Sequence, residues 1–229
     1  MREAIILVGG LGARLRSLVS DTPKSMASVA GRPFLEILLD RLEVNEFSRV
    51  ILAVGYMAEK IQSHFGNNYR GIQLVYSLED HPLGTGGAIK LAMAHCSSDH
   101  VFVFNGDTYL DFDVCEVDKM WLDYKLPIII GVNVKDTSRY GRLEVLGDDV
   151  WGVAEKQKTG PGVINGGCYL LPSRQFDDVE LGEFFSFEKD YLQWAVENGK
   201  FKCVVTSGKF IDIGVPEDYL RACVELKQL

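Results

Sequence analysis

The chain has 229 residues, of which 47% are hydrophobic and 24% are charged, and this predicts one α/β domain of a globular enzyme over residues 1–229. Its formal net charge of −8 argues against nonspecific nucleic-acid binding, and the lack of a long apolar run argues against a membrane span. Five scattered cysteines without a C-x-x-C pair favour reduced thiols over disulfides or a zinc site.

The first predicted element is a buried parallel strand over the apolar residues 4–8. Because it begins so near the first residue, we expect no signal peptide and a cytoplasmic protein. Three glycines and an arginine follow the strand: Gly9, Gly10, Gly12 and Arg14. Glycines let backbone N–H groups approach an anion, and a guanidinium suits phosphate oxygens. With Lys24 as a second cation, held after the stiff Pro23, the segment predicts a phosphate-binding loop.

This loop has three alternative interpretations. A dinucleotide-binding fingerprint would place a third glycine where Leu15 stands, and an acid after the strand at 49–54, which runs instead into Gly55 and Tyr56. A P-loop would close with Gly-Lys-Ser/Thr, which is missing. A tight turn without a ligand is the third alternative.

Helices and strands alternate along the rest of the chain. Helices are predicted over residues 33–46, 57–65, 114–124, 187–198 and 216–228, and from the 82–88 loop to residue 94; strands are predicted over 49–54, 72–76, 101–105, 127–134 and 201–205. This order predicts a Rossmann-like, mostly parallel sheet flanked by helices, with ligands beyond the carboxyl ends of its strands. We expect Trp121 in the core, and Tyr191 and Trp194 on the inward face of their helix.

Short predicted strands interrupt this alternation at 142–146, 150–154 and 163–171. They predict a small β-rich meander, about residues 135–171, inserted over the substrate side of the sheet.

Two further motifs follow predicted strands. Residues 82–88 are rich in glycine and begin a helix, so we expect their backbone to approach a ligand, although an ordinary helix start is the alternative. Asn105-Gly106-Asp107 ends a strand with a carboxylate, which suits Mg²⁺, and the alternative is a turn aspartate. Asp212 lies between Ile211 and Ile213 at a predicted strand end, where a lone charge would be costly. A metal shared with Asp107 would compensate that charge.

The segment Gly9-Gly10-Leu11-Gly12-Ala13-Arg14-Leu15, together with Thr22-Pro23-Lys24, resembles the signature of the sugar-1-phosphate nucleotidyltransferases. Ser25 departs from it, because many members have a second proline there. The resemblance extends over the whole chain and implies a glycosyltransferase-A-like fold and Mg²⁺ as cofactor. It implies catalytic roles for Arg14, Lys24 and Asp107, nucleotide contacts from Leu7, Gly9, Gly10, Gly12, Glu79, Asp80, Gly84 and Thr85, sugar-phosphate contacts from Gly141, Glu155, Lys156 and Asn165, and metal binding by Asp107 and Asp212.

The resemblance implies two substrates, a nucleoside triphosphate and a sugar 1-phosphate, which together carry about five to six negative charges. Arg14, Lys24, Lys156 and Mg²⁺ would offset these charges. Electrostatic alignment can therefore carry most of the catalysis, without a general base. We expect small-molecule partners, no nucleic acid and no membrane, and we allow a homodimer as the assembly.

Two acids precede the 82–88 loop, in the segment where the family reads the base. Only guanine offers two adjacent donors, N1–H and the N2 amino group, to one carboxylate, so Glu79 or Asp80 favours GTP. Both acids could instead be solvated loop charges. The remaining alternatives are a uridylyltransferase, a mannose-1-phosphate guanylyltransferase, a catalytically silent binding subunit and a dehydrogenase.

Overall fold

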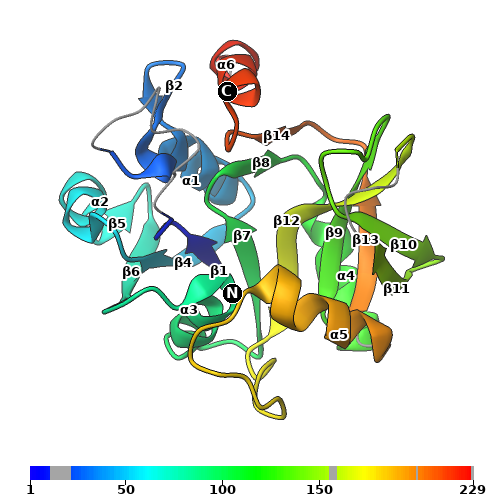
Figure 1. Ribbon diagram of the computed structural model, residues 1–229. Helices are drawn as coiled ribbons and strands as arrows, with labels where there is room; N and C mark the ends of the chain where they lie inside the picture. Colours follow the sequence, from blue (N-terminus) through cyan, green and yellow to red (C-terminus); the bar gives the residue numbers. More distant parts are fainter. Residues whose placement is uncertain (11–21, 155–158, 200, 228–229) are drawn as a thin grey trace.

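The structure is a computed structural model that describes residues 1–10, 22–154, 159–199 and 201–227 (Figure 1). The strands are β1 (Arg2–Leu7), β2 (Ser28–Val29), β3 (Arg32–Pro33), β4 (Phe47–Val54), β5 (Asn68–Tyr69), β6 (Ile72–Leu78), β7 (His100–Asn105), β8 (Thr108–Leu110), β9 (Ile128–Val134), β10 (Arg142–Leu146), β11 (Asp149–Ala154), β12 (Gly162–Pro172), β13 (Phe201–Thr206) and β14 (Phe210–Asp212). The helices are α1 (Phe34–Val44), α2 (Ala58–Phe65), α3 (Gly84–Met93), α4 (Val114–Tyr124), α5 (Gln193–Glu197) and α6 (Pro216–Glu225), with a 3-10 helix at Lys24–Met26 and a π-helix at Phe187–Leu192.

The central sheet has ten strands in the order β10-β11-β13-β9-β12-β7-β1-β4-β6-β5. Strands β7, β1, β4 and β6 run parallel to one another, as predicted for strands joined through helices, and β5 runs antiparallel to β6. Strand β12 runs antiparallel to both β7 and β9. The sheet is therefore mixed and not mostly parallel, because β12 follows the β10–β11 hairpin and not a helical crossover.

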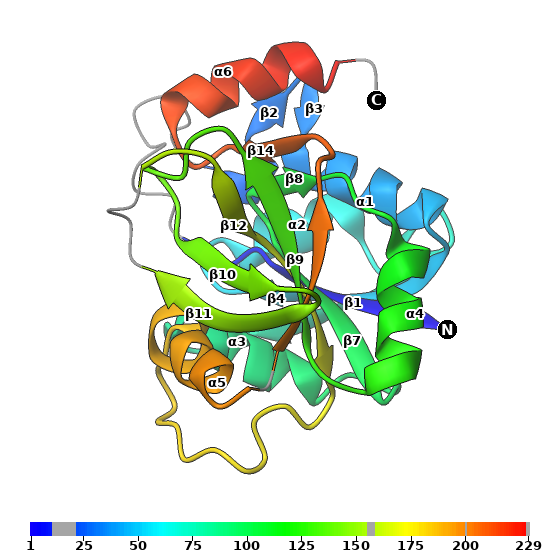
Figure 2. The same cartoon turned by 90° about the vertical axis from the view of Figure 1, so that its right-hand side faces the viewer.

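Half of this sheet closes on itself, which the sequence analysis did not predict (Figure 2). Strand β10 pairs with β11 and also with β12, so that β10, β11, β13, β9 and β12 form a small closed barrel. The predicted meander is wrong, because β11 pairs with β10 and β13 and not with β12. The register of β12 shifts between Asn165 and Cys168, and such a bulge lets one strand bend between two partners. The domain boundary at 1–229 stays a prediction.

The two faces of the sheet carry separate hydrophobic cores. Ala4 and Ile6 of β1 face one core, which also takes side chains from α1, α2, α4 and α6, whereas Ile5 faces the core formed with α3 and α5. This alternation has the two-residue period of a strand buried on both faces. Trp121 is buried as predicted. No helix among the described residues is long and apolar enough to cross a bilayer.

One predicted inward residue is on the surface. Trp194 is 42% exposed, whereas Tyr191 is 1% exposed as expected. Residues Phe187–Leu192 form a π-helix, whose wider turn changes which side chains share a face. Ala195, four positions after Tyr191, is fully buried, so the inward face continues past Leu192 and the prediction fails only at Trp194.

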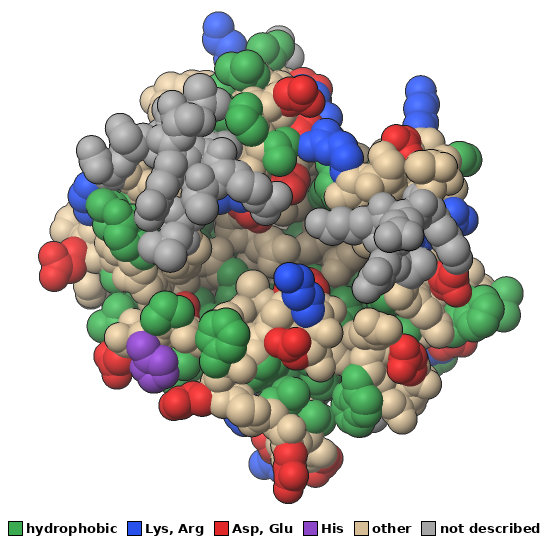
Figure 3. Space-filling model, in the orientation of Figure 1, with side chains coloured by type: hydrophobic (Ala, Val, Ile, Leu, Met, Phe, Trp, Pro, Cys, Tyr) green, Lys and Arg blue, Asp and Glu red, His purple; other side chains and the backbone are tan. Residues whose placement is uncertain are grey.

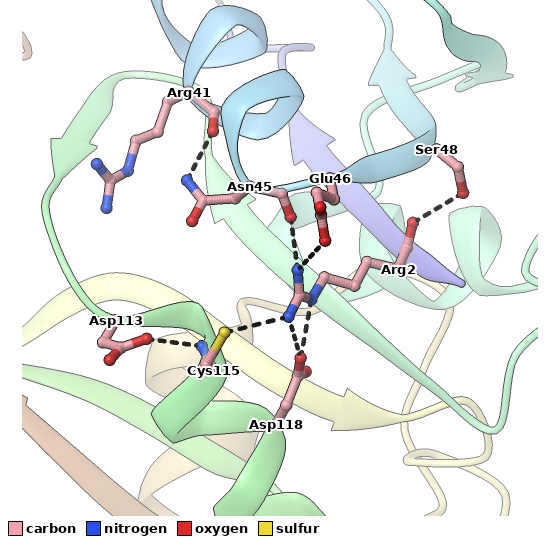
Figure 4. Close-up of polar contacts among 8 residues, drawn as sticks. All are labelled: Arg2, Arg41, Asn45, Glu46, Ser48, Asp113, Cys115 and Asp118. Atoms are coloured by element: carbon pink, nitrogen blue, oxygen red, sulfur yellow. Dashed lines mark hydrogen bonds and ion pairs between the residues drawn. The ribbon is translucent and has the colours of Figure 1, made fainter.

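Arg2 fixes the start of β1 (Figure 4). Its Nε donates to Oδ2 of Asp118 at 2.8 Å, and its Nη1 donates to the carbonyl oxygen of Asn45 at 2.8 Å. Glu46 lies within 3.7 Å of the same guanidinium. These contacts connect the start of the strand to the end of α1 and to α4. The opposite end of β1, at Leu7, lies between the carboxyl ends of β4 and β7.

Candidate active site

A pocket of about 790 Å³ opens at the carboxyl ends of β1, β4, β6 and β7. This is the edge at which parallel α/β sheets bind ligands. The face of the molecule seen in Figure 1 is hollowed near its centre (Figure 3). The pocket is lined by nine predicted site residues: Leu7, Gly9, Gly10, Lys24, Glu79, Asp80, Gly84, Thr85 and Asp107. Asp212, Gly141 and Asn165 are not among the lining residues, and Gly12, Arg14, Glu155 and Lys156 lie outside the described residues.

The first glycine of the predicted phosphate loop is required by a close approach. A Cβ on Gly9 would lie 2.8 Å from Oε1 of Glu79 and 3.2 Å from the backbone nitrogen of Gly55. For Gly10, no atom of the described residues lies within 4 Å of the same position. Gly9 therefore lets the chain pass against the ends of β4 and β6.

Two acids, Glu79 and Asp80, were predicted to read the base, and Glu79 is the more buried of the two. It is half-buried, and its Oε2 accepts a hydrogen bond from the backbone N–H of Leu83 at 3.1 Å, whereas Asp80 is exposed. Burial raises the pKa of the Glu79 carboxyl above its ordinary value, against the opposing effects of the Leu83 N–H and of His81. Glu79 is thus a fixed acceptor at one end of the pocket.

Two glycines at the start of α3, Gly86 and Gly87, do not present open N–H groups, whereas Gly84 and Thr85 line the pocket and their contact with a ligand stays a prediction. The backbone N–H groups of Gly86 and Gly87 donate to the carbonyl oxygen of Phe185 at 3.0 and 3.4 Å. Gly84 has φ +73°, and a Cβ there would lie 2.5 Å from the same oxygen. These glycines allow a distant loop to pack against the helix, and a sequence pattern does not reveal a partner so far along the chain.

Three charged side chains gather at the other end of the site. Lys24 forms an ion pair with Asp107, and their side chains are 12% and 33% exposed. Strand β14 places Asp212 opposite Thr108, and the N–H of Ile213 donates to the carbonyl oxygen of Asp107 at 2.9 Å. A Cβ on Gly214 would lie 2.7 Å from both Nζ of Lys24 and Oδ1 of Asp212.

This group has the donor chemistry that Mg²⁺ prefers. Two carboxylates, Asp107 and Asp212, lie here together with one ammonium, Lys24. No group of three or more His, Cys, Asp or Glu side chains suited to a metal occurs within the described residues. Because Mg²⁺ is commonly held by one or two carboxylates and completed by substrate phosphates, these residues fit an ion that arrives with a nucleotide.

The two predicted sugar-side residues that the structure describes, Gly141 and Asn165, adjoin each other. The N–H of Asn165 donates to the carbonyl oxygen of Gly141 at 3.4 Å. The Asn165 side chain donates from Nδ2 to the Tyr169 hydroxyl at 2.7 Å and accepts from the N–H of Gly167 at 2.9 Å. Its amide therefore orders β12, and neither Gly141 nor Asn165 lines the pocket itself.

Several pocket residues were missed as site candidates. Asn105 has a buried Oδ1, and Ser25 a buried Oγ, that have no hydrogen-bond partner among the described residues. Phe184, which is 68% exposed, and Glu188 also line the pocket. Asn105 could have been found as the residue before Gly106-Asp107, and Glu188 from the resemblance of residues 186–190 to the family, but the contact of Glu188 with Thr85, 103 positions away, has no local signal.

Gly106 should resist substitution by alanine. A Cβ there would lie 2.3 Å from the carbonyl oxygen of Leu7, which accepts the Gly106 N–H at 3.0 Å. We expect G106A to lose about 1–3 kcal/mol of unfolding free energy in urea titrations, the usual cost of overpacking. The control is G182A, where the nearest atom would be 3.9 Å away, and equal stability of the two variants would contradict the prediction.

Comparisons of the sequence and the fold with known proteins identify the relatives of this chain. The family model described as nucleotidyl transferase matches residues 3–228. The D-glycero-α-D-manno-heptose 1-phosphate guanylyltransferase of Aneurinibacillus thermoaerophilus is 41% identical over 226 residues, 98% of each chain. The protein of the same name from Campylobacter jejuni is 42% identical over 95% of this chain and 96% of its own. A crystal structure of HddC from Yersinia pseudotuberculosis complexed with GMP-PN superposes with a TM-score of 0.87 at 40% identity, covering 99% of this chain and 100% of that one.

Proposed function

The chain belongs to the nucleotidyl transferase family, and on that premise we propose that it transfers the guanylyl group of GTP to D-glycero-α-D-manno-heptose 1-phosphate. The products are GDP-heptose and pyrophosphate. The observation that carries the sugar and the nucleotide is the 41–42% identity, over nearly the whole chain, to two proteins named for this reaction. The gathering of Lys24, Asp107 and Asp212 at a pocket of suitable size supports the reaction type.

The reaction is a displacement at phosphorus. An oxygen of the sugar 1-phosphate attacks the α-phosphorus of GTP, a new P–O bond forms, and the bond from the α-phosphorus to the bridging oxygen breaks. Pyrophosphate leaves with that electron pair. The attacking oxygen is already ionised near neutral pH, so the protein needs no general base and contributes alignment and charge compensation.

Lys24 is the described cation best placed for this task. Its ammonium lies at the pocket and is held by Asp107, so it can donate to α-phosphate oxygens with little loss of side-chain freedom. Mg²⁺ held by Asp107 and Asp212 would supply further positive charge to the phosphates. Arg14 and Lys156 remain proposed phosphate ligands outside the described residues.

Glu79 is the proposed reader of guanine. Its half-buried carboxylate can accept from N1–H and the N2 amino group, whereas uracil would leave it facing an acceptor. We expect the wild type to prefer GTP to UTP by about 10²-fold in kcat/KM, and E79Q to lose most of that preference. The matched control is D80N on the exposed neighbour, and full GTP selectivity in E79Q would assign base choice to backbone groups.

The pH dependence gives an independent check on Glu79. Because burial raises the pKa of this carboxyl, it takes up a proton at a higher pH than an exposed glutamate does. The GTP preference should therefore be complete above that pKa and decline as the pH falls through it.

Pyrophosphate release tests the substrates directly. The four common nucleoside triphosphates should be combined with a panel that includes heptose, mannose and glucose 1-phosphates. We expect fastest release with GTP and the heptose 1-phosphate. Faster release with mannose 1-phosphate, or with UTP, would replace the proposed function by one of those alternatives. Release with no combination would favour a silent binding subunit. The homodimer also stays a proposal, to be checked by light scattering.

A further inference from the structure

Glu188 is an acidic side chain in the pocket wall that the proposed reaction has not used. Its carboxylate accepts from Oγ1 of Thr85 at 2.8 Å and from Oγ of Ser186 at 3.3 Å. Both hydrogen bonds end on Oε2, and Oε1 accepts none from the residues that the structure describes. One oxygen therefore fixes the side chain, and the other remains for a ligand in the pocket.

The loop that carries Glu188 is held firmly against α3. The N–H of Phe185 donates to the carbonyl oxygen of Leu83 at 3.0 Å, and the N–H of Phe187 donates to Oγ1 of Thr85 at 2.8 Å. Phe185 and Phe187 are both buried, at 3% and 0% exposure. A carboxylate on such a support is oriented before the ligand binds, which reduces the entropy lost on binding.

The surroundings of Glu188 lead toward the predicted sugar side. Burial, with the Glu188 charge as the next cause, raises the pKa of the Tyr169 hydroxyl well above its ordinary value. Tyr169 accepts from Asn165, which in turn accepts from the N–H of Gly167. A Cβ on Gly167 would lie 2.7 Å from Nδ2 of Asn105, whose buried Oδ1 has no partner in the part of the chain that the structure describes. Glu188 and Asn105 thus both line the pocket, and each has an acceptor oxygen with no partner among the described residues.

Glu188 and Asn105 can accept hydrogen bonds, so they suit the part of the substrates that carries hydrogen-bond donors. A carboxylate repels phosphate groups, and Glu79 already faces the proposed base site. A buried acceptor without a partner requires a donor, and the hydroxyl groups of a sugar supply several. We propose that Glu188 determines sugar specificity by accepting hydrogen bonds from hydroxyl groups of the sugar 1-phosphate, with Asn105 as a second acceptor on the same wall. This inference rests on the proposed function.

Steady-state kinetics of E188Q and E188A test the role. Hydrogen bonds to charged groups are strong, so we expect KM for the sugar 1-phosphate to rise about 10-fold or more, while KM for GTP and GTP binding stay unchanged. The matched control is E180Q, an exposed glutamate of the preceding loop, which should behave as the wild type. An equal rise of KM for GTP would overturn the proposal and assign Glu188 to the ribose or to loop structure.

Deoxy substrates separate recognition from loop structure. Removing the hydroxyl that Glu188 binds should cost the wild type about 10-fold or more in kcat/KM, and should cost E188A little. A damaged loop would lower activity with every sugar alike and would leave the deoxy penalty intact. If every deoxy or epimeric sugar 1-phosphate loses as much kcat/KM in E188A as in the wild type, the proposal is wrong.

The same assays distinguish this proposal from the proposed function. Wild-type turnover with GTP and the heptose 1-phosphate tests the reaction alone. Should another sugar 1-phosphate prove to be the substrate, its deoxy analogues serve for the Glu188 comparison. A wild type that fails with every sugar 1-phosphate refutes the proposed function, whereas an active wild type with an unchanged E188A refutes only the role of Glu188.

Discussion

Replacing Lys24 by alanine should lower kcat by about 10²-fold or more, the usual effect of losing one donor that stabilises transition-state charge. The ammonium pairs with Asp107, both residues line the pocket, and the Lys24 side chain is only 12% exposed. A cation aligned on the α-phosphate acts mainly in the transition state, so kcat should fall more than the KM values rise. Single-turnover measurements with saturating GTP would separate the chemical step from binding.

The matched control for Lys24 is K119A, which removes an exposed lysine of α4. Unfolding of K24A must be followed in parallel, because removing the ammonium leaves Asp107 without its ion-pair partner. Turnover of a folded K24A within a few-fold of the wild type would remove Lys24 from the mechanism.

Asp107 and Asp212 should lose activity as one unit. We expect D107N and D212N each to lower Mg²⁺-dependent turnover by about 10³-fold, and the double variant to be little worse than either. Residues that hold one ion act together, because the first substitution already removes the bound ion and the second has no further effect on it. Lys24 pairs with Asp107, its Nζ and Oδ1 of Asp212 both approach Gly214, and the β8–β14 pairing sets Asp212 opposite Thr108, so we expect the two carboxylates to be coupled.

Binding measurements complete the test of the metal site. Titration of the GTP-bound protein with Mg²⁺ or Mn²⁺ should show weaker binding in D107N and D212N, and unchanged binding in D123N, an exposed aspartate of α4. Additive losses of activity, or unchanged metal binding in either variant, would mean that the two carboxylates hold no common ion.

These variants also separate charge from base recognition. E79Q should keep the metal dependence and change only nucleotide preference, whereas D107N should keep the preference that remains measurable. We expect these two roles to be separable, because Glu79 lies after β6 and Asp107 lies after β7, with β1 and β4 between those strands.

The sequence by itself determined most elements, because hydrophobic periodicity reports how each segment buries its side chains. Helix α4 and strand β10 have the predicted bounds, and β1 alternates between two cores as a buried strand should. The residue types of the phosphate site could also be read locally, since Lys24 and Asp107 each follow a recognisable backbone signal. The pairing of Asp212 with the Asp107 region followed from the cost of isolating a charge between two isoleucines.

Only the tertiary structure decided which distant segments meet. Strand β12 closes a barrel because its bulge lets it bend, and no periodicity in β10 or β11 specifies that partner. The start of α3 packs on Phe185, and Thr85 holds Glu188, through contacts between segments about a hundred positions apart. A local pattern fixes which face of an element is buried, but the partner on that face depends on the packing of the whole chain.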